Sequence, residues 1–234
     1  MARPQPAAAI ADLGVGQSEP HEEGHGDGHD IGRSEGLEPD GYLLSVLSEA
    51  VAAVEGAGIP YVLMGGIGSA AFGRPRSTHD IDFFVRPESA RPVLEALAAA
   101  GFDTEERDPR WLFKGYKHDM LVDVIFRSSG DIYLDEEMLA RSTVESFGSC
   151  RARVIPPEDL VVIKAVTADE HVPHHWYDAL GLIGGGELDW DYLVSRARRH
   201  GTRRVLSLLL YAMSDDLGVP WRPVKALFDA VGVE

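Results

Sequence analysis

The chain has 234 residues, a formal net charge of −16 and a single cysteine, Cys150. One cysteine excludes an internal disulfide and a metal site built from cysteines, so we expect Cys150 to be a packing residue. The negative charge excludes a general attraction to nucleic acids or anionic membranes. Because no apolar run is long enough to cross a bilayer or to form a signal sequence, we expect a cytoplasmic protein without a membrane partner.

Residues 1–39 are rich in glycine, alanine, proline and acidic residues, a composition typical of disordered segments. His21, His25 and His29 recur every four residues within this segment, which on a helix would align three imidazoles for a metal ion. The glycines between them oppose a helix. We therefore interpret the segment as a solvated tail, with a specific metal site as the alternative.

Residues 40–101 show an alternation of helix and strand patterns. Helical periodicity begins at Asp40 and continues to the stop signals Gly56 and Gly58. The elements that follow are a strand over 60–64, a short helix over 67–72, a strand over 79–86 and a helix from Pro87 to Ala100. This order predicts a sheet with helices packed on it.

Two acids, Asp80 and Asp82, lie one residue apart in the second of these strands. Alternate residues of a strand point to the same face, so the two carboxylates should lie side by side. They repel each other unless a cation lies between them, and Mg²⁺ prefers carboxylates together with substrate phosphates. Gly65-Gly66 allows close approach to the backbone before a helix, a natural phosphate site. The pattern indicates nucleoside triphosphate chemistry; a plain turn followed by surface acids is the alternative.

A third acid, Asp123, lies inside an apolar run over 119–127, which forms a predicted hairpin with a strand over 111–117. If this run lies beside the strand with the two acids, the carboxylates come within roughly 5–8 Å of one another, a distance that a metal ion can bridge. An ion pair of Asp123 with Lys117 or Arg127 is the alternative.

The residues after Pro156-Pro157 show helical patterns alone, following a β pair over 142–148 and 151–155. The expected helices span 158–170, 174–183, 188–200, 203–217 and 221–231. We therefore place a domain change at this point. Lys164 lies among apolar residues of the first of these helices, where a lysine can simply extend to solvent.

Two further groups of residues have a structural interpretation. We interpret Trp111 and Tyr116 as packing residues rather than as platforms for bases. We expect the basic run to be a solvated helix end, and a phosphate contact is the alternative. The run consists of Arg196, Arg198, Arg199, His200, Arg203 and Arg204.

One set of residues matches the motif of a known superfamily: Gly65-Gly66, Ser69 and Arg76-x-Thr78-x-Asp80-x-Asp82. With Asp123 as the third carboxylate, the chain resembles the DNA polymerase β-type nucleotidyltransferases over residues 42–200. It looks most similar to the abortive-infection-toxin-like and minimal bacterial members. The resemblance implies an α/β (α+β) nucleotidyltransferase fold, with a mixed sheet and flanking helices, followed by an all-helical C-terminal domain. The implied organisation is a tail over 1–39, a catalytic domain over 40–155 and a helical domain over 156–234.

The resemblance also implies a chemistry. A nucleoside monophosphate would pass from a nucleoside triphosphate such as ATP to an acceptor hydroxyl, with release of pyrophosphate. Asp80, Asp82 and Asp123 would hold two Mg²⁺ ions, with Mn²⁺ as an alternative, and Asp123 would accept the proton of the acceptor.

The nucleotide contacts that the resemblance implies are Gly65, Gly66, Ser69, Arg76 and Thr78. Lys164 corresponds to a lysine that related enzymes often carry near the phosphates, so Lys164 or Arg76 would neutralise the leaving group. Asp178 resembles a second helical position of these families, although His174-His175 departs from the residues usual ahead of it.

The acceptor is RNA, a protein or a small molecule. A toxin that modifies tRNA or protein, with a cognate antitoxin as partner, is one expectation. An antibiotic nucleotidyltransferase of the aminoglycoside or lincosamide type is an alternative, and a non-catalytic module that binds a nucleotide or a partner is another. Three clustered carboxylates argue against the non-catalytic module, because an idle site has no use for them.

Overall fold

The computed structural model describes residues 39–72, 78, 80–169 and 173–232 of the chain. The predicted tail up to residue 38, with its three histidines, lies outside the described residues, as does Arg76 of the nucleotide motif. None of the described helices combines the length and the apolar character that crossing a bilayer requires.

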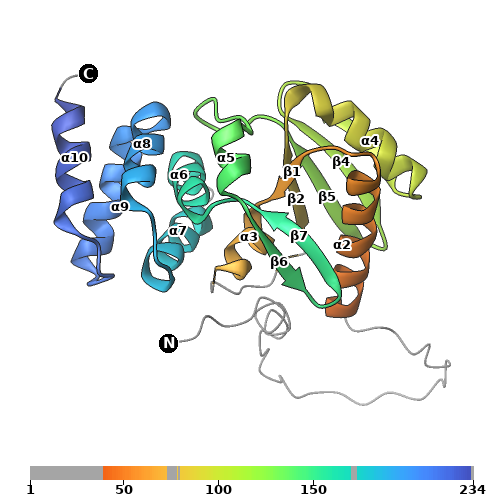
Figure 1. Ribbon diagram of the computed structural model, residues 1–234, viewed down its shortest axis with the longest axis horizontal. Helices are drawn as coiled ribbons and strands as arrows, with labels where there is room; N and C mark the ends of the chain where they lie inside the picture. The colour runs from red at the N-terminus through yellow and green to blue at the C-terminus, as the bar shows by residue number, and fades with distance from the viewer. Residues whose placement is uncertain (1–38, 73–77, 79, 170–172, 233–234) are drawn as a thin grey trace, which may run out of the picture.

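A seven-stranded mixed sheet forms the centre of the N-terminal part of the molecule (Figure 1). Its strands are β1 Tyr61–Leu63, β2 Asp80–Val85, β3 Asp103–Asp108, β4 Leu112–Lys117, β5 Met120–Ile125, β6 Thr143–Phe147 and β7 Cys150–Val154. Their order across the sheet is β3-β4-β5-β2-β1-β7-β6. β2 runs parallel to β5 and β1 runs parallel to β7, whereas the other neighbours are antiparallel. The predicted mixed sheet is therefore confirmed.

Helices flank the sheet and then continue alone toward the C-terminus. They are α2 Pro39–Gly56, α3 Gly65–Ala71, the 3₁₀ turn η1 Pro87–Ser89, α4 Ala90–Ala99, α5 Glu136–Arg141, α6 Pro157–Thr167, α7 His174–Gly185, α8 Trp190–His200, α9 Thr202–Ser214 and α10 Trp221–Val231. α2 and α4 pack against each other and against the sheet, and α3 contacts both β2 and α6. α6 to α10 form the layer at the left of Figure 1. The predicted fold class is confirmed.

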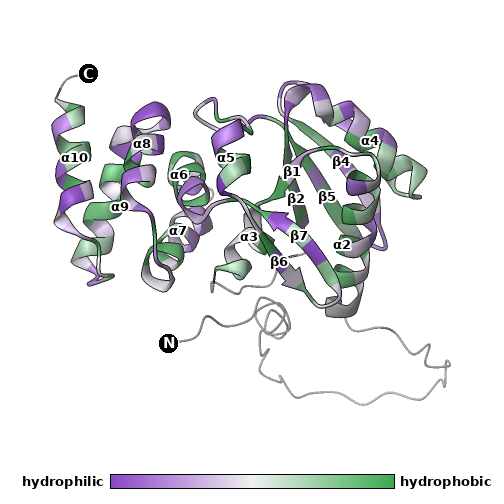
Figure 2. Cartoon of the chain, in the orientation of Figure 1, coloured by the Kyte–Doolittle hydropathy of each residue, from purple (hydrophilic) through white to green (hydrophobic). Residues whose placement is uncertain are grey.

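Burial explains why the central strands form where they do. In β2, Ile81, Phe83 and Val85 are fully buried on one face, and Phe84 is buried on the other. β5 instead alternates between buried and half-buried residues. Hydrophobic residues concentrate in these central strands (Figure 2). The polar positions of β2 and β5 are therefore exceptions in an apolar centre. Cys150 is also buried, as expected of a packing residue.

Three local features differ from the sequence predictions. β3 has the polar sequence DTEERD at the edge of the sheet, where no buried face reveals a strand. α5 was also not predicted; Asp135 caps it by accepting a hydrogen bond from the backbone N–H of Met138 at 2.8 Å. α3 begins at Gly65, so the glycine pair forms its first turn rather than a separate turn before it. Glycine is a poor helix former, which is why the pattern indicated a later start.

Arg196, in the basic run, is buried rather than solvated. It is 0% exposed, and its Nε lies 2.5 Å from Oδ1 of Asp159 on α6. It also forms an ion pair with Asp135, the residue before α5. Burial raises the pKa of Asp159 to about 6, and the charge of Arg196 opposes that rise. The predicted solvated helix end is therefore wrong for Arg196, which connects α8 to α6 and to α5.

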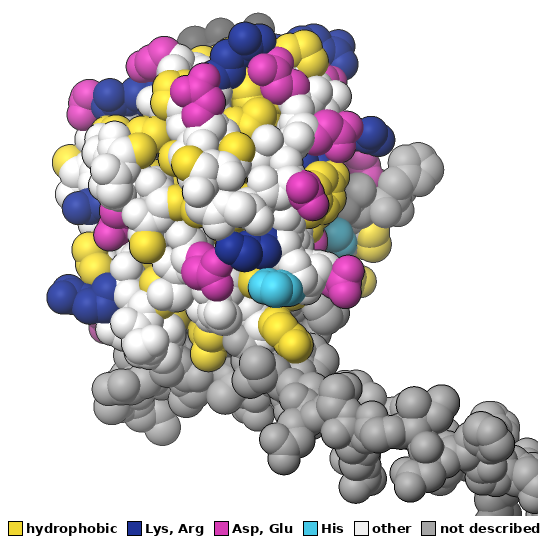
Figure 3. All heavy atoms as spheres, turned by 90° about the vertical axis from the view of Figure 1, so that its right-hand side faces the viewer, with side chains coloured by type: hydrophobic (Ala, Val, Ile, Leu, Met, Phe, Trp, Pro, Cys, Tyr) yellow, Lys and Arg dark blue, Asp and Glu magenta, His cyan; other side chains and the backbone are white. Residues whose placement is uncertain are grey.

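Basic and acidic side chains are interspersed on the surface. Figure 3 shows this mixture on the face at the right-hand side of Figure 1. Exposed ion pairs of the described chain include Arg91 with Glu106 at 3.0 Å and Arg110 with Asp108 at 2.6 Å. Such pairs leave these arginines partly neutralised toward solvent.

Arg196→Met tests the role of the buried ion pair. The substitution leaves Asp159 buried without its cation, so we expect the free energy of unfolding to fall by about 3 kcal/mol or more. The matched control is Arg203→Met, an exposed arginine of the same basic run, which should change it by less than about 0.5 kcal/mol. Urea denaturation followed by circular dichroism measures both, and equal effects of the two substitutions would contradict this account.

Candidate active site

The parallel pairing of β2 and β5 brings three carboxylates to one face of the sheet. Asp82 is the register partner of Asp123, so the two residues are direct neighbours on adjacent strands. Asp80 lies two residues before Asp82, at the exposed start of β2, and shares its face. The strand of Asp123 thus lies beside that of Asp80 and Asp82, as the sequence predicts.

The glycine pair lies against this face because no side chain would fit there. A β-carbon on Gly65 would lie 1.8 Å from Oδ2 of Asp82, and Gly65 also has a positive φ of 62°. A β-carbon on Gly66 would lie 2.7 Å from Oγ1 of Thr78. Both glycines are therefore required by close contact with the strand that carries the acids.

Of the two predicted hydroxyl contacts, only one faces the open side of the site. Thr78 lines the pocket described below, together with the glycine pair. Ser69 is completely buried, and its hydroxyl donates a hydrogen bond of 2.8 Å to the carbonyl oxygen of Gly65. Ser69 thus stabilises the first turn of α3 from the buried side.

Asp123 has an ion-pair partner that the sequence analysis missed. Nζ of Lys114 lies 2.7 Å from Oδ1 of Asp123, and both side chains are only 17% exposed. The alternatives Lys117 and Arg127 are wrong, because these residues pair with Glu49 and Asp131 instead. Lys114 and Asp123 are equally distant from the hairpin turn, and this symmetry was the available signal.

The surroundings of Asp123 act on its protonation in opposite directions. Burial raises the pKa of the Asp123 carboxyl, hydrogen bonding and charge from Lys114 lower it, and the charge of Asp80 raises it again. The net direction is upward. A carboxylate in this position is stabilised by any cation that approaches it.

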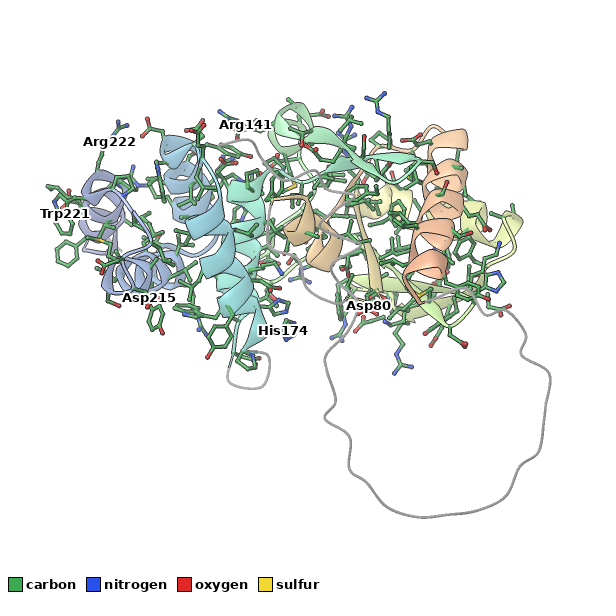
Figure 4. All side chains as sticks on the ribbon, turned by 90° about the horizontal axis from the view of Figure 1, so that it is seen from below. Asp80, Arg141, His174, Asp215, Trp221 and Arg222 are labelled. Atoms are coloured by element: carbon green, nitrogen blue, oxygen red, sulfur yellow. The ribbon has the colours of Figure 1, made fainter. Side chains whose placement is uncertain are left out.

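A pocket of about 680 Å³ opens between the sheet and the helical part. Asp80, Asp82 and the glycine pair line one side of it, and α6 and α7 contribute the opposite side. In Figure 4, which views the molecule from below, Asp80 of β2 and His174 of α7 lie along the same edge of the molecule. Asp123 is not among the described residues that line this pocket.

The β4 and β5 end of the pocket carries an exposed aromatic residue. Trp111 is 42% exposed and lines the pocket beside Arg110 and Arg127. Its backbone is fixed on both sides, since its N–H donates to Asp108 and its carbonyl accepts from Phe126. Its interpretation as a packing residue is therefore wrong. Tyr116 is also exposed, and its hydroxyl donates to Glu105 at 3.3 Å.

Lys164 is buried and does not extend to solvent. It is 2% exposed, and its Nζ lies 2.8 Å from Oδ2 of Asp178 on α7. Lys164 nevertheless lines the pocket, whereas Asp178 lies behind it. The simple solvent-seeking interpretation is thus wrong. Asp178, which resembles a second helical position of the related families, is the residue that fixes the position of this lysine.

The donor atoms fit a hard divalent cation by type. Carboxylate oxygens are the ligands that Mg²⁺ prefers, and the carboxylates of Asp80 and Asp82 both line the pocket. Among the described residues, no three histidine, cysteine, aspartate or glutamate side chains converge closely enough to hold a metal ion together. The acids are thus arranged on one face without forming a closed ligand cluster.

Comparisons with known proteins place the chain in a family. The profile of the family described as "Uncharacterised nucleotidyltransferase" matches residues 42–217. A search of curated proteins found no significant match.

Three solved structures are among the matches, each at low sequence identity. The antibiotic-resistance factor ANT(2'')-Ia is 18% identical, with a TM-score of 0.49 over 74% of this chain and 92% of its own. The lincosamide antibiotic adenylyltransferase LnuA, bound to lincomycin, is 14% identical, with a TM-score of 0.42 over 60% of this chain and 92% of its own. A nucleotidyltransferase-like protein from Paracoccidioides brasiliensis is 14% identical, with a TM-score of 0.47 over 79% of this chain and 92% of its own. Because the family profile spans most of its length, the chain belongs to the family described as "Uncharacterised nucleotidyltransferase".

Proposed function

We propose that the protein transfers a nucleoside monophosphate from a nucleoside triphosphate to an acceptor hydroxyl, with release of pyrophosphate. The observation that carries the proposal is the register of β2 with β5, which sets Asp82 beside Asp123 next to the glycine pair and the pocket. We infer that residues 40–155 act as the catalytic domain. Residues 156–234 then form a helical domain that supplies the opposite side of the pocket.

The transfer step is a displacement at the α-phosphorus. The acceptor oxygen forms a bond to the α-phosphorus, and the bond from that phosphorus to the oxygen that bridges to the β-phosphorus breaks. The proton of the acceptor hydroxyl passes to a carboxylate oxygen of Asp123. Asp123 is suited to this role because its strand holds it rigidly beside Asp82.

Asp80, Asp82 and Asp123 are the residues that would hold divalent metal ions, Mg²⁺ or Mn²⁺. When bound, two such ions supply neutralisation of the triphosphate and activation of the acceptor hydroxyl. Asp82 lines the pocket beside the glycine pair, on the side where we place the phosphates. Asp80 is exposed at the start of β2 and lines the same pocket.

The glycine pair and Thr78 form the side of the pocket on which we place the β- and γ-phosphates. Gly65 and Gly66 line the pocket in the first turn of α3, where backbone N–H groups without an intrahelical partner would bind phosphate oxygens. Ser69 contributes indirectly, through its hydrogen bond to the carbonyl of Gly65. Arg76 is assigned to the same phosphates by the motif it belongs to.

Lys164 faces these phosphates from α6 and would neutralise the charge that develops on the leaving pyrophosphate. Its ion pair with Asp178 holds the ammonium group in one place before the nucleotide arrives. A lysine held in this way loses little conformational freedom on binding.

We place the acceptor at the β4 and β5 end of the pocket. The phosphate site lies toward β1 and α3, so the acceptor must approach from the other side of the carboxylates, where Trp111 is exposed. The indole offers a flat surface for a sugar or base ring, and Arg110 and Arg127 flank it.

The class of acceptor is tested by labelling. Purified protein with each α-³²P-labelled nucleoside triphosphate, Mg²⁺ and a cell extract should transfer label to a small molecule, to RNA or to protein. Label on RNA or protein, with arrested growth of cells that express the chain, would support a toxin with an antitoxin partner. Label on an added aminoglycoside or lincosamide would support antibiotic modification. A protein that binds nucleotide but never transfers label is a binding module.

Substitution of the acids tests the metal and catalytic roles. Asp80→Asn and Asp82→Asn should abolish the rise in melting temperature that Mg²⁺ and triphosphate cause, and should lower transfer by about 100-fold or more. Asp123→Asn should lower transfer more than nucleotide binding. Thermal shift and labelled transfer measure these effects.

Asp119→Asn is the control. Asp119 is exposed in the hairpin turn at a φ of 61°, which asparagine tolerates, so the variant should behave as wild type. Full transfer by Asp82→Asn would refute the mechanism.

Trp111→Ala tests the acceptor side of the pocket. Loss of a stacking surface that contributes ~1–3 kcal/mol should raise the KM for the acceptor roughly tenfold. The thermal shift caused by Mg²⁺ and triphosphate should stay unchanged. Trp221→Ala, which removes an exposed tryptophan from α10, outside the residues that line the pocket, should alter neither quantity. If Trp111→Ala changes the thermal shift caused by Mg²⁺ and triphosphate but leaves the KM for the acceptor unchanged, the nucleotide and acceptor sides of the pocket are assigned the wrong way round.

A further inference from the structure

We propose that Lys114 is a built-in counterion of the active site, which holds the carboxylate of Asp123 in the metal-free protein and leaves it when a divalent cation binds. The inference rests on the proposed function, because it concerns the same three acids. It assigns Lys114 as a positioning residue.

The contact is specific in its geometry. Lys114 on β4 is the register partner of Asp123 on β5, so both side chains point to the same face of the sheet. Nζ and Oδ1 lie 2.7 Å apart, within the range of a charge-assisted hydrogen bond. With 17% exposure each, the two groups are largely withdrawn from solvent. Such a pair is much more costly to break without a replacement than an exposed one.

The pair accounts for two properties of the site. Asp80 and Asp82 line the pocket, whereas Asp123 is not among its described lining residues although it is adjacent to Asp82. The three acids also do not form a closed ligand cluster in the described part of the chain. Both follow if the ammonium group of Lys114 engages Asp123 and keeps its carboxylate turned toward β4.

A second carboxylate is available to Lys114 when it leaves Asp123. Glu105 on the edge strand β3 is its register partner on the other side. Glu105 is exposed, and it receives hydrogen bonds of 3.3 Å from Tyr116 and 3.4 Å from Arg107. The flexible stem of a lysine can therefore exchange one neighbouring carboxylate for the other by rotation of its side chain, without movement of the sheet.

The residue type matters for this role. An ammonium group is a compact point charge with three donors on a rotatable chain, whereas a guanidinium group forms planar, two-pronged contacts with carboxylates. A cation and Lys114 both neutralise Asp123, so the binding of one weakens the binding of the other.

The test compares Lys114→Met with Lys117→Met. Lys117 is a matched control because it lies on the same strand, is 19% exposed and forms its own ion pair with Glu49 at 2.5 Å. Mn²⁺ binding is measured by electron paramagnetic resonance, with and without a non-hydrolysable triphosphate, and melting temperatures are measured in EDTA.

Both substitutions should lower the melting temperature in EDTA by about 3 °C or more, because each breaks an ion pair. Only Lys114→Met should tighten Mn²⁺ binding, by roughly fivefold or more, the lower end of typical couplings. Unchanged or weaker Mn²⁺ binding by Lys114→Met would overturn the inference, as would equal tightening by Lys117→Met, which would indicate a general charge effect.

A second measurement does not depend on a stable variant. In crystals of the wild-type protein with Mg²⁺ and the same triphosphate, Nζ of Lys114 should lie beyond 4 Å from Asp123. An intact contact with metal bound at Asp80 and Asp82 would overturn the inference and leave the proposed function standing. A wild-type protein that binds neither Mn²⁺ nor the triphosphate would instead overturn the proposed function itself.

Discussion

The parallel pairing of β2 with β5 is the constraint on which the rest of the site depends. It sets Asp82 directly beside Asp123 in a sheet whose centre is otherwise apolar. Two neighbouring carboxylates repel each other there, and a cation beside either of them reduces the repulsion. Lys114 places its ammonium group on Asp123, whereas Asp82 lies directly against Gly65, where a side chain would not fit. The glycine-led start of α3 and the register of the β4–β5 hairpin thus serve the same pair of acids.

The helical side of the pocket is organised by buried charges in a comparable way. α6 carries Asp159, which pairs with Arg196 of α8, and Lys164, which pairs with Asp178 of α7. The hydroxyl of Tyr192 donates to Asp159 at 2.6 Å as well. Ion pairs withdrawn from solvent require good geometry, so they fix how α7 and α8 lie against α6. The orientation of Lys164 at the pocket is therefore a result of helix packing.

The sheet and the acids were predictable because they depend on short-range patterns. Alternation in β2 and the lone acid in the apolar run of β5 were sufficient to place both strands. The contact of Lys114 with Asp123 was also predictable, because a hairpin pairs residues at equal distance from its turn. The sequence analysis named Lys117 instead, which is nearer to Asp123 in the sequence. The partners of Lys164 and Arg196 were not predictable, because they lie on other helices whose packing the sequence pattern does not encode. The edge strand β3 shows no buried face, so periodicity had nothing to detect.

Arginines of the basic run form ion pairs within the protein, and this affects how an acceptor approaches it. Arg196 is buried between Asp159 and Asp135, and Arg199 pairs with Glu137, so the basic run offers less positive potential than its composition suggests. The net charge of −16 already counts these arginines, and the basic run opposes it locally less than its composition suggests. An anionic acceptor such as tRNA is repelled at long range, and added salt, which screens that repulsion, should accelerate its association. A polycationic acceptor should associate more slowly in salt. The sign of the ionic-strength dependence of the association rate thus distinguishes the two kinds of acceptor before any product is identified.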